Sequence, residues 1–242
     1  MSFRNEFHKL KNESFKVKLE YIFTYYWIPI LTVAALLVIL VSQMIHFATR
    51  KEAVLSGHFI NAIFEQEDSE RFLSDVSSKM NIEEKTSEIS LSNSLLSSDD
   101  PYSMMAAHQL ITAQIAAKSL DFLVGDIDTL SQYAYDESFL DIRTVLSTEQ
   151  TAVLSPYFLF IDRAIIEQIS QSGEPPKEFP DPTKPETMKK PMPFAVQIPE
   201  NSEFDNVYFA QTTKAIAIAI ICNGPNPTGA AQFIFLACES FQ

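Results

Sequence analysis

The chain has few of the residues from which catalytic and ligand-binding sites are usually built. Five glycines in 242 residues are too few for the usual glycine-rich loops that hold phosphate groups. The four histidines are scattered, and no G-x-S-x-G, P-loop or H-E-x-x-H motif occurs. Acidic pairs such as Asp99 and Asp100 are typical of ordinary surface charge. The sequence therefore predicts a protein that is not an enzyme and holds no metal or cofactor.

Cysteine is equally scarce, with only Cys222 and Cys238. We expect Cys222 to end a strand and Cys238 to end the helix that returns along it, which separates them by on the order of 14 Å. The Cα atoms of a disulfide are usually less than about 7 Å apart. The sequence therefore predicts two buried free thiols.

One long apolar segment stands out, without a charge from residue 27 to residue 48. About 20 such residues in a helix cross a hydrocarbon core of roughly 30 Å. Tyr25, Tyr26 and Trp27 form an aromatic group typical of membrane interfaces, and Pro29 is expected in the first helical turn. A cleaved signal peptide has a shorter apolar core, about 7–15 residues, and a small-residue cleavage site. The segment therefore predicts an uncleaved signal anchor that crosses the lipid bilayer once.

Basic residues predict the orientation of this span. Only Arg50 and Lys51 follow it closely. Those that precede it are Arg4, Lys9, Lys11, Lys16 and Lys18. We therefore expect residues 1–26 in the cytoplasm, a transmembrane helix at 27–48 and residues 51–242 outside the cell membrane. The apolar residues within 1–26 leave two interpretations open, a mere positive flank or an amphipathic helix on the inner leaflet, where lysines meet anionic lipid.

Charge changes sharply after the span. Residues 51–242 hold 12 of the 18 basic and 28 of the 31 acidic residues, a net charge of about −16. Such a charge excludes a nucleic-acid-binding surface and repels anionic lipid, so we expect this part to stand off the membrane. An acidic surface suits a cationic ligand, but solubility also explains it.

Residues 51–242 have the length of one domain and alternate between strand and helix patterns. Strands are predicted at 56–64, at 86–92 and up to Gly125, and each is followed by a helical pattern. The first helix has Asp68 or Ser69 as its expected N-cap, and the second starts near Tyr102. This order predicts an α/β fold with a mixed, mainly parallel sheet covered by helices.

The second half of the domain is more broken. Strands are predicted at 155–161, 193–199 and 215–221, and the last is apolar on both faces, as a central strand is. Residues 173–193 hold seven of the 13 prolines and predict an extended or disordered loop. A closing helix from Thr228 is apolar almost all round, so it is either buried in the domain or docked on another protein.

Two passages resemble one lobe of the type 2 extracellular solute-binding proteins that serve bacterial transporters. They are "QIAAKSLDFLVGDIDTLSQYAYDESFLDI" at 114–142 and "AIAIAIICNGPNPTGAAQFIFLACESF" at 215–241. The anchored N-terminus followed by such a lobe is also similar to membrane proteins of Gram-positive bacteria. A complete binding protein of this family has two lobes with the ligand between them. Here only residues 140–190 could supply the second lobe, so we expect that lobe to be reduced or lost.

A retained ligand site is expected beyond the carboxyl ends of the strands, near helix N-termini. The candidate ligand-binding residues there are Gln66, Asn93, Asp126, Asp128 and Asn223. Ordinary structural roles compete with this interpretation. Asp126 or Asp128 could cap the next helix, and Asn223 with Gly224 forms a natural turn pair. His108 lies near Ile115 on its helix, which favours a partly buried structural histidine.

Two functions remain as hypotheses. In the first, the domain is an interaction subunit of a membrane complex, in contact with an integral-membrane protein. In the second, it is a tethered receptor that captures a small solute for a transporter. The reduced second lobe, the apolar closing helix and the lack of a polar cluster favour the first.

Overall fold

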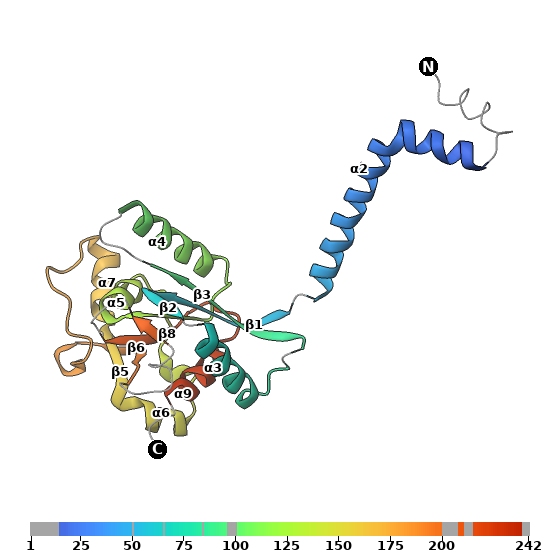
Figure 1. Ribbon diagram of the computed structural model, residues 1–242. Helices are drawn as coiled ribbons and strands as arrows, with labels where there is room; N and C mark the ends of the chain where they lie inside the picture. Colours follow the sequence, from blue (N-terminus) through green and yellow to red (C-terminus); the bar gives the residue numbers. More distant parts are fainter. Residues whose placement is uncertain are drawn as a thin grey trace. The chain divides into compact units, whose positions relative to one another are not determined.

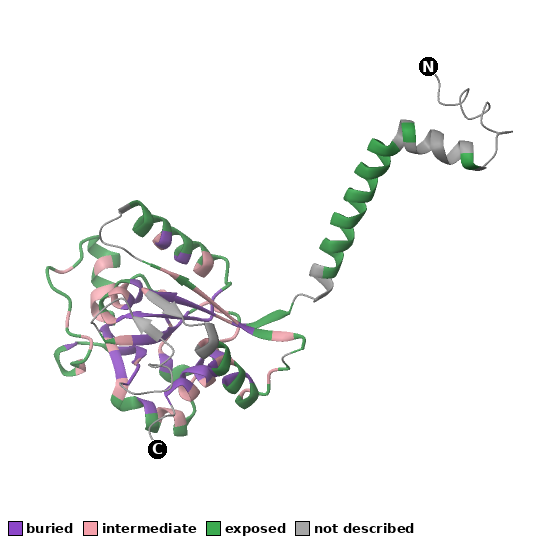
Figure 2. Ribbon diagram, in the orientation of Figure 1, coloured by how far each residue is buried: buried purple, intermediate pink, exposed green. Residues whose placement is uncertain are grey.

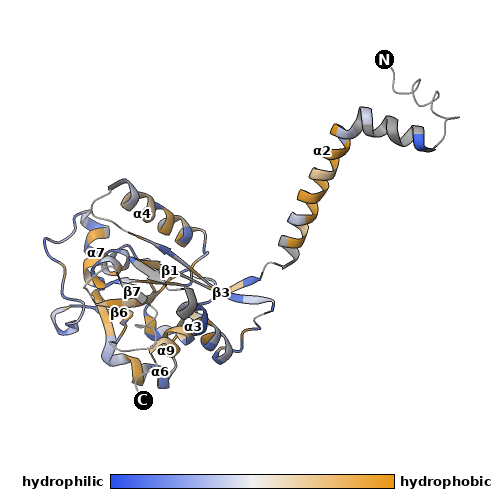
Figure 3. Cartoon of the chain, viewed as in Figure 1, coloured by the Kyte–Doolittle hydropathy of each residue, from blue (hydrophilic) through white to orange (hydrophobic). Residues whose placement is uncertain are grey.

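The computed structural model describes residues 15–49, 51–64, 66–83, 85–95, 101–199, 208–210 and 215–238. The chain forms two compact units, Met1–Arg50 and Lys51–Gln242, which are described separately. The first contains one helix, α2 (Phe15–Thr49). Its segment Trp27–Ile45 has a mean hydropathy of 2.5 and is long and apolar enough to span a membrane (Figure 3).

Helix α2 begins earlier than the sequence indicated. Pro29 was expected in the first turn, but the helix already starts at Phe15, so Pro29 lies inside it. Proline has no N–H to bond the carbonyl of Tyr25, and its ring collides with that carbonyl, which bends a helix. Figure 1 shows that α2 is bent in its N-terminal half, the half that contains Pro29.

The second unit is built on a six-stranded sheet in the order β3-β1-β4-β8-β6-β5. These strands are β1 (Glu52–Ile60), β3 (Ser87–Ser94), β4 (Phe122–Asp126), β5 (Phe158–Asp162), β6 (Pro191–Gln197) and β8 (Ile216–Ile220). A separate two-stranded sheet contains β2 (Ala62–Phe64) and β7 (Tyr208–Ala210). The helices are α3 (Gln66–Lys79), α4 (Pro101–Ala116), α5 (Ile127–Tyr135), α6 (Thr148–Leu154), α7 (Arg163–Ser172) and α9 (Pro227–Cys238). Three short 3₁₀ turns are η2 (Ile142–Thr144), η3 (Ser155–Tyr157) and η4 (Pro185–Thr187).

The predicted α/β class and mixed sheet are confirmed, but the sheet is not mainly parallel. Strand β1 is parallel to β3 and β4, whereas the β4–β8, β8–β6 and β6–β5 pairs are antiparallel. The cause is an extra helix. After β4, α5 carries the chain to the opposite edge, where Phe139 bridges Ile221, and α6 then brings it back. Strand β5 therefore starts at the end of the sheet at which β4 finishes, and it runs in the opposite direction to β4. The strand joins the same sheet, so residues 140–190 contribute to this domain rather than to a second lobe.

Helices cover both faces of the sheet (Figure 1). One apolar core packs under α3, α6 and α9, and the other under α4, α5 and α7. The central strand β8 contributes Ile218 and Ile220 to the first core, and Ala217 and Ala219 to the second. These four side chains are at most 1% exposed, which confirms the predicted central strand.

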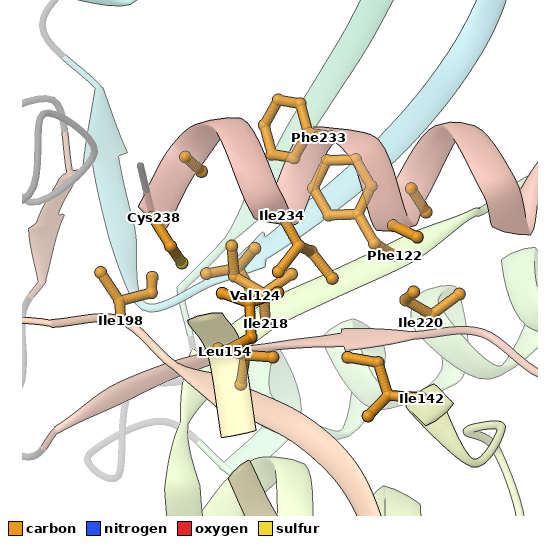
Figure 4. Packing of buried hydrophobic residues seen from close by; sticks show 14 of the residues in the cluster. Phe122, Val124, Ile142, Leu154, Ile198, Ile218, Ile220, Phe233, Ile234 and Cys238 are labelled. Atoms are coloured by element: carbon orange, nitrogen blue, oxygen red, sulfur yellow. The ribbon is translucent and has the colours of Figure 1, made fainter. Parts of the chain in front are cut away.

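The closing helix α9 is buried in the domain. Figure 4 shows its side chains packed against those of β4 and β8. Phe233 stacks on Phe122 with the ring centroids 4.6 Å apart, and Ala230 and Ala231 allow the helix to approach the sheet closely. Burial within the domain therefore accounts for its uniformly apolar sequence. The first helix of the domain, α3, begins at Gln66, earlier than the predicted N-cap at Asp68 or Ser69.

The proline-rich segment 173–193 is packed, contrary to expectation. The carbonyl of Pro182 accepts a hydrogen bond from the Phe160 N–H of edge strand β5 at 2.8 Å. Phe179 lies against Tyr135 with the ring centroids 4.4 Å apart, and Met188 is buried. The segment thus covers a strand edge that would otherwise present unpaired backbone groups.

Both cysteines are free, as expected, but only one is buried. Cys238 lies in the core beneath α9, and its burial raises the pKa of its thiol to about 12. Cys222 is exposed in the turn after β8, so the expectation of two buried thiols is wrong for it.

An aspartate in place of Ile218 should unfold the domain. The substitution places a carboxylate with no partner in the core, which costs several kcal/mol, comparable with the stability of an ordinary domain. Chemical denaturation of residues 51–242 measures the change. Val153→Asp on α6 is the matched control, since Val153 is 39% exposed. An Ile218→Asp variant that unfolds like the parent would contradict the central position of β8.

Candidate functional site

The carboxyl ends of three parallel strands meet at one edge of the sheet. Ile60 at the end of β1 pairs with Ser94 at the end of β3, and Phe59 pairs with Val124 of β4. Open α/β sheets bind ligands at such edges. The predicted site residues carried by elements at this edge are Asn93 in β3, Asp126 at the end of β4 and Asp128 in α5. Gln66, also predicted, is the first residue of α3.

Asn223 lies at the opposite edge. Because β8 runs antiparallel to β4, Ile216 pairs with Asp126 and Ile220 pairs with Phe122. Asn223 comes after the end of β8, so it is separated from Asp126 by the length of the strand. The five predicted residues therefore do not share one site.

Asp126 has a structural role that occupies both carboxylate oxygens. It is the N-cap of α5, where its Oδ1 accepts from the Thr129 N–H at 3.0 Å and its Oδ2 from the Thr129 hydroxyl at 2.8 Å. The side chain is nearly buried. Asp128 lies in the first turn of the same helix and is exposed. The sequence left open whether Asp126 or Asp128 caps α5, and the cap is Asp126.

Asn223 ties the turn after β8 to the end of α4. Its side-chain amide donates to the Ile115 carbonyl at 3.0 Å. Its Oδ1 is buried and accepts no hydrogen bond from the described residues, and the same holds for Oε1 of Gln114 in the preceding position of α4. Buried acceptors without donors lower stability, so the contact between the turn after β8 and the end of α4 lacks two of its possible hydrogen bonds.

A buried polar cluster that the sequence analysis missed joins β1 to the edge strand β3. His58 is fully buried, with Nδ1 2.9 Å from the Ser92 hydroxyl and Nε2 3.1 Å from the Ser94 hydroxyl. Ser92 in turn donates to the Gly57 carbonyl at 3.3 Å. This direction assigns the proton to Nδ1, which donates to Ser92, and makes Nε2 the acceptor from Ser94.

The contact between Ser94 and His58 has the distance of a serine with its general base. Burial, however, lowers the pKa of His58 to about 4, which makes it a weak base at neutral pH. Its Nδ1 faces a hydroxyl and not a carboxylate. The cluster is therefore suited to holding β3 in register. The signal in the sequence was the serine at every second position of β3, on the sheet face that also carries His58.

Two more buried carboxylates hold loops in place. Asp121 accepts from the Ser56 N–H at 2.8 Å and the Asn226 N–H at 2.6 Å, and burial raises its pKa despite these bonds. Asp162 accepts from Lys189 and Lys190 N–H groups at 2.8 and 2.9 Å. Burial opposes the charge of Asp162, but the backbone amides outweigh it, so its pKa is lowered.

Helix α4 is held by few contacts. Ala107 and Ile111 face the core, and His108 Nδ1 lies 2.6 Å from the Tyr133 hydroxyl of α5. His108 is half-buried, as expected for a structural histidine. Burial, together with the charge of Asp136, raises the pKa of Tyr133 to about 12, so the hydroxyl remains protonated.

The side of α4 that faces away from these contacts is exposed (Figure 2) and mostly apolar, with Gln109 and Thr112 as its polar members. We call it the α4 outer face, and its apolar members are Tyr102, Met105, Ala106, Leu110 and Ala113. Tyr102 is 81%, Met105 53% and Leu110 48% exposed. None of the 16 residues of α4 is charged. Helices on a solvated surface normally carry charges there, so this face is the candidate interaction site.

No group of three or more metal-ligating side chains occurs within the described residues. Comparison with protein-family models, curated proteins and solved structures finds no match to this chain.

The domain should lose stability as the pH falls from 6.5 towards 4.5. In this range the unfolded chain protonates His58, whereas folded His58, with its pKa near 4, stays neutral. Full protonation would cost roughly 3 kcal/mol. Thermal unfolding across this pH range measures the effect. His58→Gln should flatten the dependence and His108→Gln should retain it; equal slopes in the two variants would contradict this role of His58.

Proposed function

We propose that this chain is a non-enzymatic single-pass membrane protein whose acidic α/β domain lies outside the cell membrane and is an interaction subunit of a membrane transport complex. The α4 outer face is the observation that carries the proposal. The cores of protein interfaces are depleted in charged residues and enriched in tyrosine and methionine, the composition of this face. It stands out on a domain whose net charge is about −16.

The partner we propose is an integral-membrane protein. The domain is covalently continuous with α2. If α2 crosses the bilayer, this tether raises the effective concentration of the domain towards membrane partners. Its acidic charge disfavours anionic lipid as the surface that covers α4.

Capture of a small solute is the second candidate function. The shared carboxyl edge of β1, β3 and β4, with Asn93 and Asp128, supports it. Three observations weaken it: Asp126 is engaged by Thr129, Asn223 lies at the other edge, and residues 140–190 supply strand β5 to the same sheet. The interaction subunit is therefore the better-supported function.

A photo-cross-linking residue at Leu110 should capture a membrane protein in the native membrane, whereas one at Val153 should not. Both positions are exposed, but only Leu110 belongs to the α4 outer face. Met105→Glu should abolish the Leu110 cross-link, because a buried charge without a partner opposes association. Its effect on unfolding should stay within about 0.5 kcal/mol, since Met105 faces solvent.

The same cross-link at both positions, or at neither, would contradict docking through α4. A thermal-shift screen of the domain with metabolites completes the test. A ligand at 100 times its Kd stabilises by about 2.7 kcal/mol. Such a shift, reduced by Asn93→Ala and accompanied by no α4 cross-link, would establish the receptor in place of the interaction subunit.

Protease added to intact cells should digest residues 51–242 and spare residues 1–25. The excess of basic residues before the apolar helix supports this orientation. Immunoblotting with tags at each end of the chain distinguishes the fragments. Digestion after the membrane is permeabilised is the control, and protection of the domain in intact cells would overturn the orientation.

A further inference from the structure

Helix α2 is longer than a membrane span requires. Its 35 residues extend over about 52 Å if straight, against a hydrocarbon core of roughly 30 Å. Twelve of the extra residues, 15–26, precede the apolar segment Trp27–Ile45. We call residues 15–26 the N-terminal arm. A straight helix would project the arm roughly 18 Å beyond the bilayer core.

The bend redirects the N-terminal arm. Pro29 interrupts the hydrogen-bond ladder in the turn where the arm meets the apolar segment, and the arm departs from the axis of that segment (Figure 1). An arm turned away from the axis of a spanning helix runs along the membrane surface. The aromatic residues Tyr25, Tyr26 and Trp27 at the junction suit the interface between lipid and water.

The sequence of the N-terminal arm has helical apolar periodicity. Phe15, Leu19 and Ile22 recur at spacings of four and three, which places them on one helical face. Lys16, Glu20 and Thr24 fall on the other side of the helical wheel, together with Val17, and Lys18 lies at the border of the apolar face beside Ile22. Lys16 and Thr24 are exposed. A helix with one apolar and one polar face is the form that lies in a membrane interface.

We propose that the N-terminal arm lies in the lipid headgroup layer, with its apolar face towards the acyl chains and its lysines towards lipid phosphates. The occupant of this face is the bilayer itself, because the arm is continuous with the helix proposed to cross it. The arm holds two lysines and one glutamate, a net charge of +1, and residues 1–26 as a whole carry +2, which favours anionic lipid. This proposal takes the second of the two interpretations that the sequence left open. It rests on the proposed membrane span of α2 but not on any partner of α4.

Site-directed spin labelling of the full chain in liposomes tests the arm directly. Single cysteines are placed one at a time along residues 15–26, in a background with Cys222→Ser and Cys238→Ala whose fold is checked by circular dichroism. Oxygen, which concentrates in lipid, should relax labels at 15, 19 and 22 best. A water-soluble nickel chelate should relax labels at 16, 20 and 24 best, so the ratio of the two accessibilities oscillates with the helical period.

Two uniform patterns would overturn the proposal. Access of the nickel chelate at every position would mean a solvated arm, and access of neither reagent would mean an arm buried against protein. Pro29→Ala should remove the oscillation by straightening the helix, whereas Val33→Ala, one turn further along, should keep it. Unchanged oscillation in Pro29→Ala would overturn the role of the bend.

The lipid headgroups are tested with the same labels. Vesicles that contain phosphatidylserine should move the labels at 15, 19 and 22 deeper than vesicles of phosphatidylcholine alone. Lys16→Gln with Lys18→Gln should remove that difference. Equal depth in both lipids would overturn the contact between lysines and phosphates.

Discussion

The buried carboxylate of Asp121 is the interaction on which the domain most depends. Its backbone N–H donates to the Ser56 carbonyl and its carbonyl accepts from Ile221, so it joins β1 to β4 and β4 to β8. Its side chain adds the Ser56 and Asn226 amides. Asn226 in turn accepts from the Gly229 N–H in the first turn of α9. One residue therefore connects three strands and the helix that closes the core. Removal of its carboxylate would leave the two half-buried amides of Ser56 and Asn226 without this acceptor.

The turn between β8 and α9 is shaped by the same contact. A Cβ atom at Gly224 would lie 2.8 Å from the Leu120 carbonyl and 3.0 Å from the Asp121 Cα. Only glycine lets the turn approach this closely, and the approach brings the Asn226 N–H to the Asp121 carboxylate. The turn between Asn223 and Asn226 is therefore explained by folding, without a ligand at either residue.

Local patterns in the sequence predicted the elements but not their directions. The apolar run of β8 and the β-forming residues of β3 are properties of single strands, so these strands could be read directly. The single strand predicted at 56–64 is divided between β1 and β2. Direction depends on the connection between strands, and the short helix α6 reverses β5. That reversal decides which polar residues can meet, and it is why Asn223 and Asp126 lie at opposite edges.

Contacts between distant segments were equally invisible in the sequence. Proline in residues 173–193 correctly excluded regular structure over most of the segment, but the order of the loop comes from Asp162 and Tyr135, which are remote in the chain. His58 shows the same limit, because its partners Ser92 and Ser94 belong to a neighbouring strand. Pro29 was misjudged for a local reason, the unexpected start of α2 at Phe15.

The distribution of burial suggests where function can reside. Most side chains of strand β8 and helix α9 are buried in the core, so a substitution there changes stability before it changes binding. Helix α4 shows the reverse, since Ala107 and Ile111 are its only buried side chains among those described, and its outer face supplies uncharged surface. Elements with few buried contacts open at low free-energy cost. Such a helix can shift with little effect on the sheet, which is the property that the proposed interaction through α4 would need.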